Sequence, residues 1–185
     1  SIGTLGINSN KNKIGLQNTT LDSLQLAKYL SKLKDQKIDN VILEASSHGL
    51  SQNRLDGLKF QIGIFTNLSH DHLDYHKSYK NYLNAKLYLF RKLLKNNSNI
   101  ITDFDIPEYK KIKIISKKKR NKINTISLKN GDLSVISHEY HGEKQLLKVR
   151  YKKKIYEFQL NLVGKIQLKN ILMSMLAASL NNIKF

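Results

Sequence analysis

The sequence predicts an α/β fold in which a mostly parallel sheet is flanked by helices and ends in a small antiparallel part. Short continuous apolar runs alternate with segments of helical periodicity, which is the rhythm of buried parallel strands joined by helices. Three further segments near the C-terminus alternate apolar and polar residues and are separated by turns, which predicts an antiparallel meander. The apolar runs lie at residues 41–43, 60–65 and 98–101, and the alternating segments at 132–137, 146–151 and 154–160.

Four helices follow from apolar periodicity and from their start signals. The first spans residues 21–34, with Thr19 or Thr20 as its N-cap. The second begins after Ser78 and runs to about residue 95. Pro107 opens a short helix over 106–111, and short strands are expected at 112–115 and 123–127. The last helix covers 165–181 after Gly164, whereas residues 1–20 are expected to form an irregular entry and loop.

Composition limits the functional classes. The chain of 185 residues carries a net charge of +18 and has no cysteine, so it has neither a disulfide framework nor a thiolate metal site. We expect a cytoplasmic, monomeric protein, and the absence of cysteine fits a cytosolic location. No membrane partner is expected, because no apolar run approaches the roughly 18–20 residues of a membrane span. The basic charge leaves a nucleic-acid-binding module as an alternative. However, the densest basic run, at 117–122, has no interleaved aromatic residues and is predicted to be a solvated loop.

Polar residues follow directly after the predicted strand at 41–43. Ligands of open α/β sheets gather at the carboxyl ends of strands, and Glu44 lies at such an end. Its carboxylate is a suitable ligand for Mg²⁺ beside nucleotide phosphates. The turn expected at 46–49 is followed by Gln52 and Arg54, and an arginine here suits a substrate carboxylate or phosphate.

The segment from Asn67 to Lys86 contains a cluster of histidines and aspartates and then a lysine on an apolar helix face. His70, His72 and His76 resemble the metal signature of metallo-β-lactamase-type hydrolases with one residue inserted, so a zinc hydrolase is a further alternative. Lys86 lies in the middle of the apolar stripe of the helix after Ser78. Burial lowers the pKa of a lysine, and a neutral lysine can react with CO₂ to give a carbamate, which resembles a carboxylate ligand.

Together these segments resemble the central domain of the Mur ligases, and within that family the ligases that add the third residue of the peptidoglycan stem peptide. Folylpolyglutamate synthase-type ligases and other Mur ligases are the near alternatives. The resemblance covers nearly the whole chain and is most specific at 43–54 and 65–90. The matching segments are 3–6, 18–20, 43–50 with Gln52 and Arg54, 65–76, 85–86 with 89–90, and Gly164 with Asn170.

The resemblance implies an ADP-forming amide ligase that uses ATP and Mg²⁺. Its substrates would be UDP-MurNAc-L-Ala-D-Glu, activated as an acyl phosphate, and a diamino acid, either meso-diaminopimelate or lysine. Glu44 and His72 would bind metal, and a carbamylated Lys86 would serve a second Mg²⁺, so that His72 and Lys86 are the expected catalytic residues. The resemblance assigns the remaining roles as follows: Asn18, Thr19, Thr20, Ser46, Gln52 and Arg54 to the UDP-muramoyl dipeptide, and Asn67 and Asn170 to ATP.

The resemblance also has departures. Gln167 stands where the family usually has Asn, His70 where Arg is common, and the pair at 102–103 where Asn-Ala is usual. The sequence contains no glycine-rich phosphate loop ending in Gly-Lys-Thr. We therefore expect residues 1–185 to be an incomplete central, ATP-binding domain, without the N-terminal UDP-binding and C-terminal amino-acid-binding domains, and inactive by itself.

Overall fold

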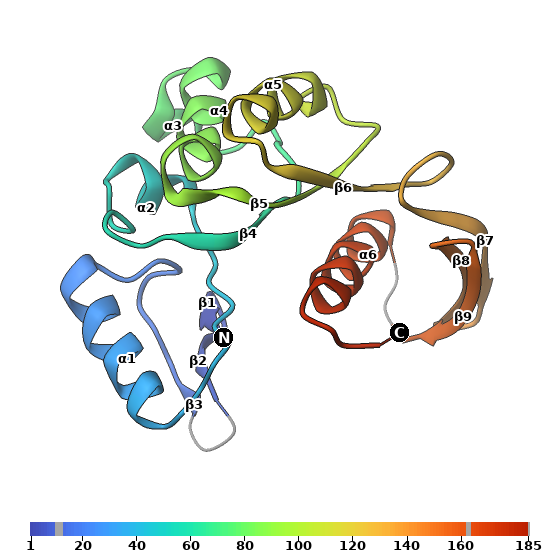
Figure 1. Cartoon of the computed structure of the whole chain (residues 1–185), viewed down its shortest axis with the longest axis horizontal. Coiled ribbons are helices and arrows are strands. Elements are labelled where there is room, and N and C mark those ends of the chain that lie inside the picture. The colour runs from blue at the N-terminus through green and yellow to red at the C-terminus, as the bar shows by residue number, and fades with distance from the viewer. Residues whose placement is uncertain (10–12, 162–163, 185) are drawn as a thin grey trace. The chain divides into compact units, whose positions relative to one another are not determined.

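The computed structural model describes residues 1–9, 13–161 and 164–184 (Figure 1). The chain forms two compact units. The first comprises Ser1–Lys59 and His70–Leu93, and the second comprises Phe60–Ser69 and Leu94–Phe185. Among the described residues, no helix combines the length and the apolar character needed to cross a membrane.

The first unit combines a small antiparallel sheet with short helices. The sheet has the order β1-β2-β3, and it replaces the irregular entry expected for residues 1–20. Ser78 caps α4 as predicted, because its side chain accepts a hydrogen bond from the Asn81 amide at 3.2 Å. The strands are β1 Ile2–Gly3, β2 Gly6–Asn8 and β3 Lys13–Ile14. The helices are α1 Ser23–Asp35, α2 Ser47–Ser51, α3 Leu73–His76, α4 Tyr79–Tyr88 and the π-helical turn η1 Leu89–Leu93.

Two expectations for this unit are wrong. The N-cap of α1 is Asp22, whose carboxylate accepts a hydrogen bond from the Gln25 amide at 2.9 Å, and not Thr19 or Thr20. Residues 41–43 do not form a buried strand, since only Leu43 makes a bridge, to Ile2 of β1, and Ile42 is 76% exposed. A buried strand needs a pairing strand on each side, but among the described residues only β1 pairs with this run. The apolar character of the run could not show this.

The second unit is built on a six-stranded sheet with the order β4-β5-β6-β7-β8-β9. Neighbours from β4 to β7 are parallel, whereas β7, β8 and β9 form the antiparallel meander that the alternation predicted. The predicted mostly parallel sheet with an antiparallel part is therefore confirmed. The strands are β4 Phe60–Phe65, β5 Leu94–Asp103, β6 Lys122–Ser127, β7 Leu133–His141, β8 Lys144–Tyr151 and β9 Lys154–Leu160.

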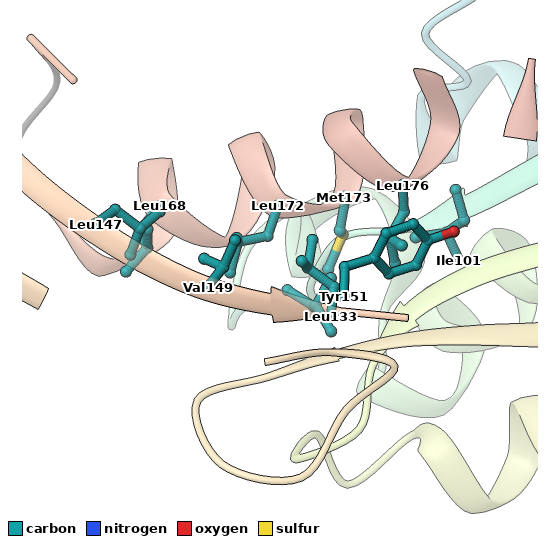
Figure 2. Close-up of a cluster of buried hydrophobic side chains, with 10 residues drawn as sticks. Ile101, Leu133, Leu147, Val149, Tyr151, Leu168, Leu172, Met173 and Leu176 are labelled. Carbon is teal, nitrogen blue, oxygen red and sulfur yellow. The ribbon is translucent and has the colours of Figure 1, made fainter. Parts of the chain in front are cut away.

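Helices α5, Tyr109–Lys119, and α6, Lys165–Leu180, cover opposite faces of β5 and β6 (Figure 1). Helix α6 begins after Gly164, as predicted, and buries Leu168, Leu172, Met173 and Leu176. Figure 2 shows these side chains packed against residues from β5 to β8. Burial of this apolar surface joins the parallel part of the sheet to the meander, because α6 contacts both. The strand residues of this core are Ile101, Ile126, Leu133, Leu147, Val149 and Tyr151.

Helix α5 corrects two predictions. The expected strand at 112–115 is helical, and so is the first half of the expected solvated loop at 117–122, because α5 extends from residue 109 to residue 119. Ile112 and Ile115 are buried while Ile114 is 58% exposed, which is a helical and not a strand period. The basic run therefore supplies the last helical turn, where cations interact favourably with the helix dipole.

The end of α5 offers a test of local strain. Arg120 ends the helix in the left-handed region at φ 55°, where a side chain is unfavourable and glycine is not. We expect Arg120→Gly to raise the free energy of unfolding by about 0.5–1 kcal/mol. Urea unfolding followed by circular dichroism measures the change. Lys118→Gly, inside the last turn, is the matched control and should lower that free energy by about 0.5–1 kcal/mol. An Arg120→Gly chain no more stable than wild type would contradict the prediction.

Candidate functional site

Glu44 follows the bridge at Leu43 and is held by the turn between β1 and β2. Its Oε2 accepts hydrogen bonds from the Thr4 amide at 2.8 Å and from Thr4 Oγ1 at 2.9 Å. A Cβ atom added at Gly3 would lie 2.6 Å from Glu44 Oε2, so this close approach requires glycine. Among the described residues, none donates a hydrogen bond to the other carboxylate oxygen, Oε1. That oxygen remains available to a ligand.

Thr20 connects Glu44 to the start of α2. Its Oγ1 lies 2.9 Å from the carbonyl oxygen of Glu44 and 3.0 Å from Ser46 Oγ, and accepts a hydrogen bond from the Ser46 amide at 2.9 Å. Ser46 is the N-cap of α2 and accepts from the Gly49 amide at 3.1 Å. A Cβ atom at Gly49 would lie 2.6 Å from Thr20 Cγ2, so the packing of Thr20 requires glycine there. The expected turn at 46–49 is thus the capped start of a helix.

Arg54 and Gln52 extend this hydrogen-bonded group. Arg54 donates from Nη1 to the carbonyl oxygen of Thr20 at 2.8 Å and from Nε to Gln52 Oε1 at 2.8 Å. Gln52 Nε2 in turn donates to the phenol oxygen of Tyr75 at 3.1 Å. Thr19 Oγ1 lies 3.1 Å from Thr4 Oγ1. Five of the six expected substrate residues therefore belong to one hydrogen-bonded network with Glu44, in which Thr20 bonds to Glu44 directly and the others connect through Thr20, Arg54 or Thr4.

Asn18, the sixth of these residues, lines a groove beside the network. The groove has a volume of about 730 Å³ and lies between residues 15–18 and helix α1. Lys28 and Lys32 lie along its helical side, so the groove combines polar and basic groups. A groove of this size can hold part of a ligand of several hundred daltons.

His72 and Lys86 lie against the ring of Tyr82, which is buried in α4. The His72 ring meets the Tyr82 ring edge-on at 5.8 Å, and Lys86 Nζ lies 5.2 Å from the Tyr82 ring centre. Burial lowers the pKa of Lys86, an effect that the negative charge of Asp71 opposes. A lower pKa increases the neutral amine fraction, which is the form that can react with CO₂.

The other histidines of the segment have different roles. His76 is buried, its Nε2 lies 3.0 Å from Ser47 Oγ, and its ring stacks on Tyr82 at 5.1 Å. Burial lowers the pKa of His76, and the charges of His48 and His72 lower it further. The His70 ring lies 5.7 Å from Tyr79. Within residues 1–9, 13–161 and 164–184, no three His, Cys, Asp or Glu side chains form a metal-binding group, so the zinc hydrolase alternative has no site there.

Glu44 and His72 are candidate ligands for a metal ion whose other ligands would come from water and the substrate. Glu44 offers a carboxylate oxygen, and His72, which is exposed and directly precedes α3, offers an imidazole nitrogen. His72 has an unusual left-handed backbone at φ 55°, stabilised by its amide donating to Asp71 Oδ1 at 2.9 Å. Mg²⁺ is usually held by one or two carboxylates together with waters and substrate phosphates. The Glu44 carboxylate therefore fits Mg²⁺, and a Lys86 carbamate would add a further oxygen ligand.

The two expected ATP contacts lie in the second unit. Asn67 follows β4, and Asn170 lies exposed on α6. Next to Asn170, Lys169 Nζ lies 2.5 Å from the carboxylate of Asp103 at the end of β5. Asp103 is one of the residues at which the sequence departs from the family pattern, and Lys169 supplies its counter-ion.

Sequence reasoning missed four residues that build the site: Thr4, His48, Tyr75 and Tyr82. The His48 ring lies 5.0 Å from His72 and 4.2 Å from Tyr75, so it connects the metal-ligand candidates to the substrate network. Tyr82 was treated only as an apolar residue of the stripe, although its position one turn before Lys86 was visible in the sequence. Thr4 lies in the matching segment 3–6, but its role depends on a contact forty residues away along the chain, which the sequence pattern does not show.

Several known proteins resemble this chain. A family model described as the Mur ligase middle domain matches residues 1–178. A relative from Zymomonas mobilis is 36% identical over 174 residues, covering 94% of this chain and 36% of the relative. One from Clostridium botulinum is 36% identical over 182 residues, covering 98% of this chain and 36% of the relative. Both relatives are named UDP-N-acetylmuramoyl-L-alanyl-D-glutamate–2,6-diaminopimelate ligase.

A solved structure of a protein with that same name superposes with a TM-score of 0.82 at 28% identity. The superposition covers 96% of this chain and 37% of the solved chain. The chain thus spans just over a third of the length of the curated relatives it matches. Because the family model covers nearly all of the sequence, the chain belongs to the Mur ligase family and corresponds to its middle domain.

Proposed function

We propose that this chain is the middle part of an ATP-dependent ligase that joins 2,6-diaminopimelate to UDP-MurNAc-L-Ala-D-Glu in peptidoglycan synthesis. The network linking Thr20, Ser46, Gln52 and Arg54 to Glu44 is the observation that carries the proposal. It joins the groups that would bind the substrate anion and the metal ion into one hydrogen-bonded unit. The names of the relatives favour diaminopimelate as the amino acid over lysine.

The reaction has two chemical steps. The terminal carboxylate of the D-Glu residue attacks the γ-phosphorus of ATP, and ADP leaves. The amine of the diamino acid then attacks the acyl carbon, inorganic phosphate leaves with the bonding electrons, the amine loses a proton and an amide forms. Bound Mg²⁺ supplies charge neutralisation during phosphoryl transfer.

The residues of this chain have positioning and electrostatic roles in the proposal. Glu44 and His72 would bind Mg²⁺, and a carbamylated Lys86 would add oxygen ligands for a second ion. Asn18, Thr19, Thr20 and Ser46 would bind the UDP-muramoyl dipeptide together with Gln52 and Arg54. Asn67 and Asn170 would contact ATP. Holding the reacting groups in place lowers the barrier by reducing the entropy lost at the transition state.

The ligase itself provides the direct test. The full-length protein that carries this chain is incubated with ATP, Mg²⁺, UDP-MurNAc-L-Ala-D-Glu and meso-diaminopimelate. We expect ADP release and a product whose mass corresponds to the added amino acid. Parallel reactions with lysine or D-glutamate as the amine test the amino-acid assignment. Failure to form the diaminopimelate product, with the protein folded, would overturn the proposal.

We also expect residues 1–185 alone to form no tripeptide product. The sequence lacks a Gly-Lys-Thr phosphate loop, and without such a loop the β- and γ-phosphates of ATP lose their main backbone ligands. The assay is the same product measurement, with the full-length protein as the positive control. ATP-dependent product formation by the 185-residue chain would refute this expectation.

A further inference from the structure

Tyr75 lies at one end of the hydrogen-bonded network and has no role in the proposed reaction. Its ring packs on His48 at 4.2 Å, and its phenol oxygen contacts Gln52 Nε2 at 3.1 Å and Ser51 Oγ at 2.9 Å. The side chain connects helix α3, which begins just after His72, to helix α2 and the residues that follow it.

The direction of each hydrogen bond around Tyr75 follows from counting hydrogens. Ser51 Oγ donates its one hydrogen to the carbonyl oxygen of His48 at 3.3 Å, so the Tyr75 hydroxyl donates to Ser51. Gln52 Nε2 donates to the phenol oxygen, which places Gln52 Oε1 toward Arg54 Nε. The order is therefore Arg54 to Gln52 to Tyr75 to Ser51 to the backbone of His48.

This order fixes the guanidinium of Arg54. Nε is committed to Gln52, and Nη1 is committed to the carbonyl oxygen of Thr20. Among the described residues, none accepts a hydrogen bond from Nη2. A guanidinium held by two bonds presents its remaining N–H groups in one direction, which suits recognition of a carboxylate or phosphate oxygen.

We infer that Tyr75 is a positioning residue for the substrate, acting through Gln52 to orient Arg54 toward an anionic oxygen of the UDP-muramoyl dipeptide. The inference rests on the proposed function, because the substrate that it names comes from that proposal. Without the Tyr75 hydroxyl, the Gln52 amide loses its anchor to α3, and the Arg54 guanidinium samples more orientations. Substrate binding then weakens, whereas the fold and the ATP contacts, which Tyr75 does not touch, remain.

Tyr75→Phe in the full-length ligase tests the inference, because phenylalanine keeps the ring contacts with His48 and removes only the hydroxyl. We expect the Kd for UDP-MurNAc-L-Ala-D-Glu, measured by calorimetry, to rise roughly three- to tenfold. The KM for ATP and the melting temperature should stay at their wild-type values. Tyr88→Phe is the matched control, since Tyr88 donates its hydroxyl to Asp56 in the same unit but outside the network. This control should leave the Kd unchanged.

A double-mutant cycle distinguishes positioning of Arg54 through Gln52 from a direct contact between Tyr75 and the substrate. If Tyr75 acts through Gln52, the Kd of Gln52→Ala/Tyr75→Phe equals that of Gln52→Ala alone. If the two substitutions act independently, so that their separate increases in Kd multiply in the double variant, the inference is overturned. A wild-type Kd for Tyr75→Phe would overturn it as well. Ser51→Ala provides a second variant, since it removes the acceptor of the Tyr75 hydroxyl and should weaken binding in the same direction.

Two ligands identify the anionic oxygen and separate this inference from the proposed function. UDP-MurNAc-L-Ala has the diphosphate but lacks the D-Glu carboxylates. If the Tyr75→Phe penalty disappears with this shorter ligand, Arg54 binds a peptide carboxylate, and if the penalty persists, Arg54 binds phosphate. A wild-type protein that binds neither ligand would overturn the proposed function together with this inference. Normal wild-type binding with no Tyr75→Phe effect would overturn this inference alone.

Discussion

Lys86→Ala is expected to lower the turnover of the full-length ligase about a hundredfold or more. Lys86 lies against the ring of Tyr82 on α4, and burial lowers its pKa, which increases the fraction of neutral amine that carbamate formation needs. If the carbamate serves as an oxygen ligand for Mg²⁺, its loss removes charge neutralisation where phosphoryl transfer needs it. The measurement is kcat for ADP release at saturating substrates.

Chemical rescue distinguishes a carbamate from an ordinary ammonium. A short carboxylic acid such as formate can supply the missing oxygen ligand in the space vacated by the lysine side chain. We expect added formate to restore part of the Lys86→Ala activity and to leave wild type unaffected. Lys80→Ala, which truncates an exposed lysine on the same helix, is the control and should keep full activity. Unchanged activity of Lys86→Ala without any added acid would refute the carbamate role.

Lys169→Met is expected to lower the free energy of unfolding of the 185-residue chain by about 2–4 kcal/mol. Lys169 Nζ lies 2.5 Å from Asp103 Oδ2, and the Asp103 side chain is 0% exposed whereas that of Lys169 is 31% exposed. Asp103 also accepts a hydrogen bond from the Asp105 amide at 2.9 Å. Methionine preserves the packing of the lysine stem but leaves a buried carboxylate without its cation, which is strongly unfavourable.

Urea unfolding followed by circular dichroism measures this change. Lys148→Met is the matched control, because Lys148 forms an exposed ion pair with Glu157 at 2.6 Å in the same unit. Its loss should change the free energy of unfolding by less than about 1 kcal/mol. Asp103→Asn combined with Lys169→Met should recover part of the lost stability, since no buried charge then remains. Equal effects of Lys169→Met and Lys148→Met would contradict the buried ion pair.

The sequence predicted those features that depend on local periodicity. The strand at 60–65 was correctly identified from a short apolar run, and the strand at 123–127 was also correct. The meander and the last helix were correctly identified because a period of two or 3.6 residues shows which side of an element is buried. The Ser78 cap was also predicted, since a cap uses contacts within one helical turn. The family was identified from the motifs around Glu44 and Asp71, which the family model confirms.

Predictions failed where distant segments decide the structure. Residues 41–43 are apolar enough for a strand, yet their pairing depends on β1, which supplies one bridge only. Residues 112–115 were ambiguous because four apolar-rich residues fit a strand as well as a helix. Burial of Ile112 and Ile115 on one side of α5 resolved the choice. Thr20 was a reasonable helix cap by sequence, but its hydroxyl bonds to Glu44 and Ser46 instead.

The sequence by itself thus determined the fold class, the family and the residue types of the candidate site, because these depend on composition, periodicity and motif spacing along the chain. Only the tertiary structure decided that Thr4 holds Glu44, that Tyr82 underlies both His72 and Lys86, and that Tyr75 connects to Arg54 through Gln52. The physical reason is that these contacts depend on distance in space and not on distance along the chain. A hydrogen bond or ring contact acts over a few ångströms in space, and the residues that it joins can lie tens of positions apart in the sequence.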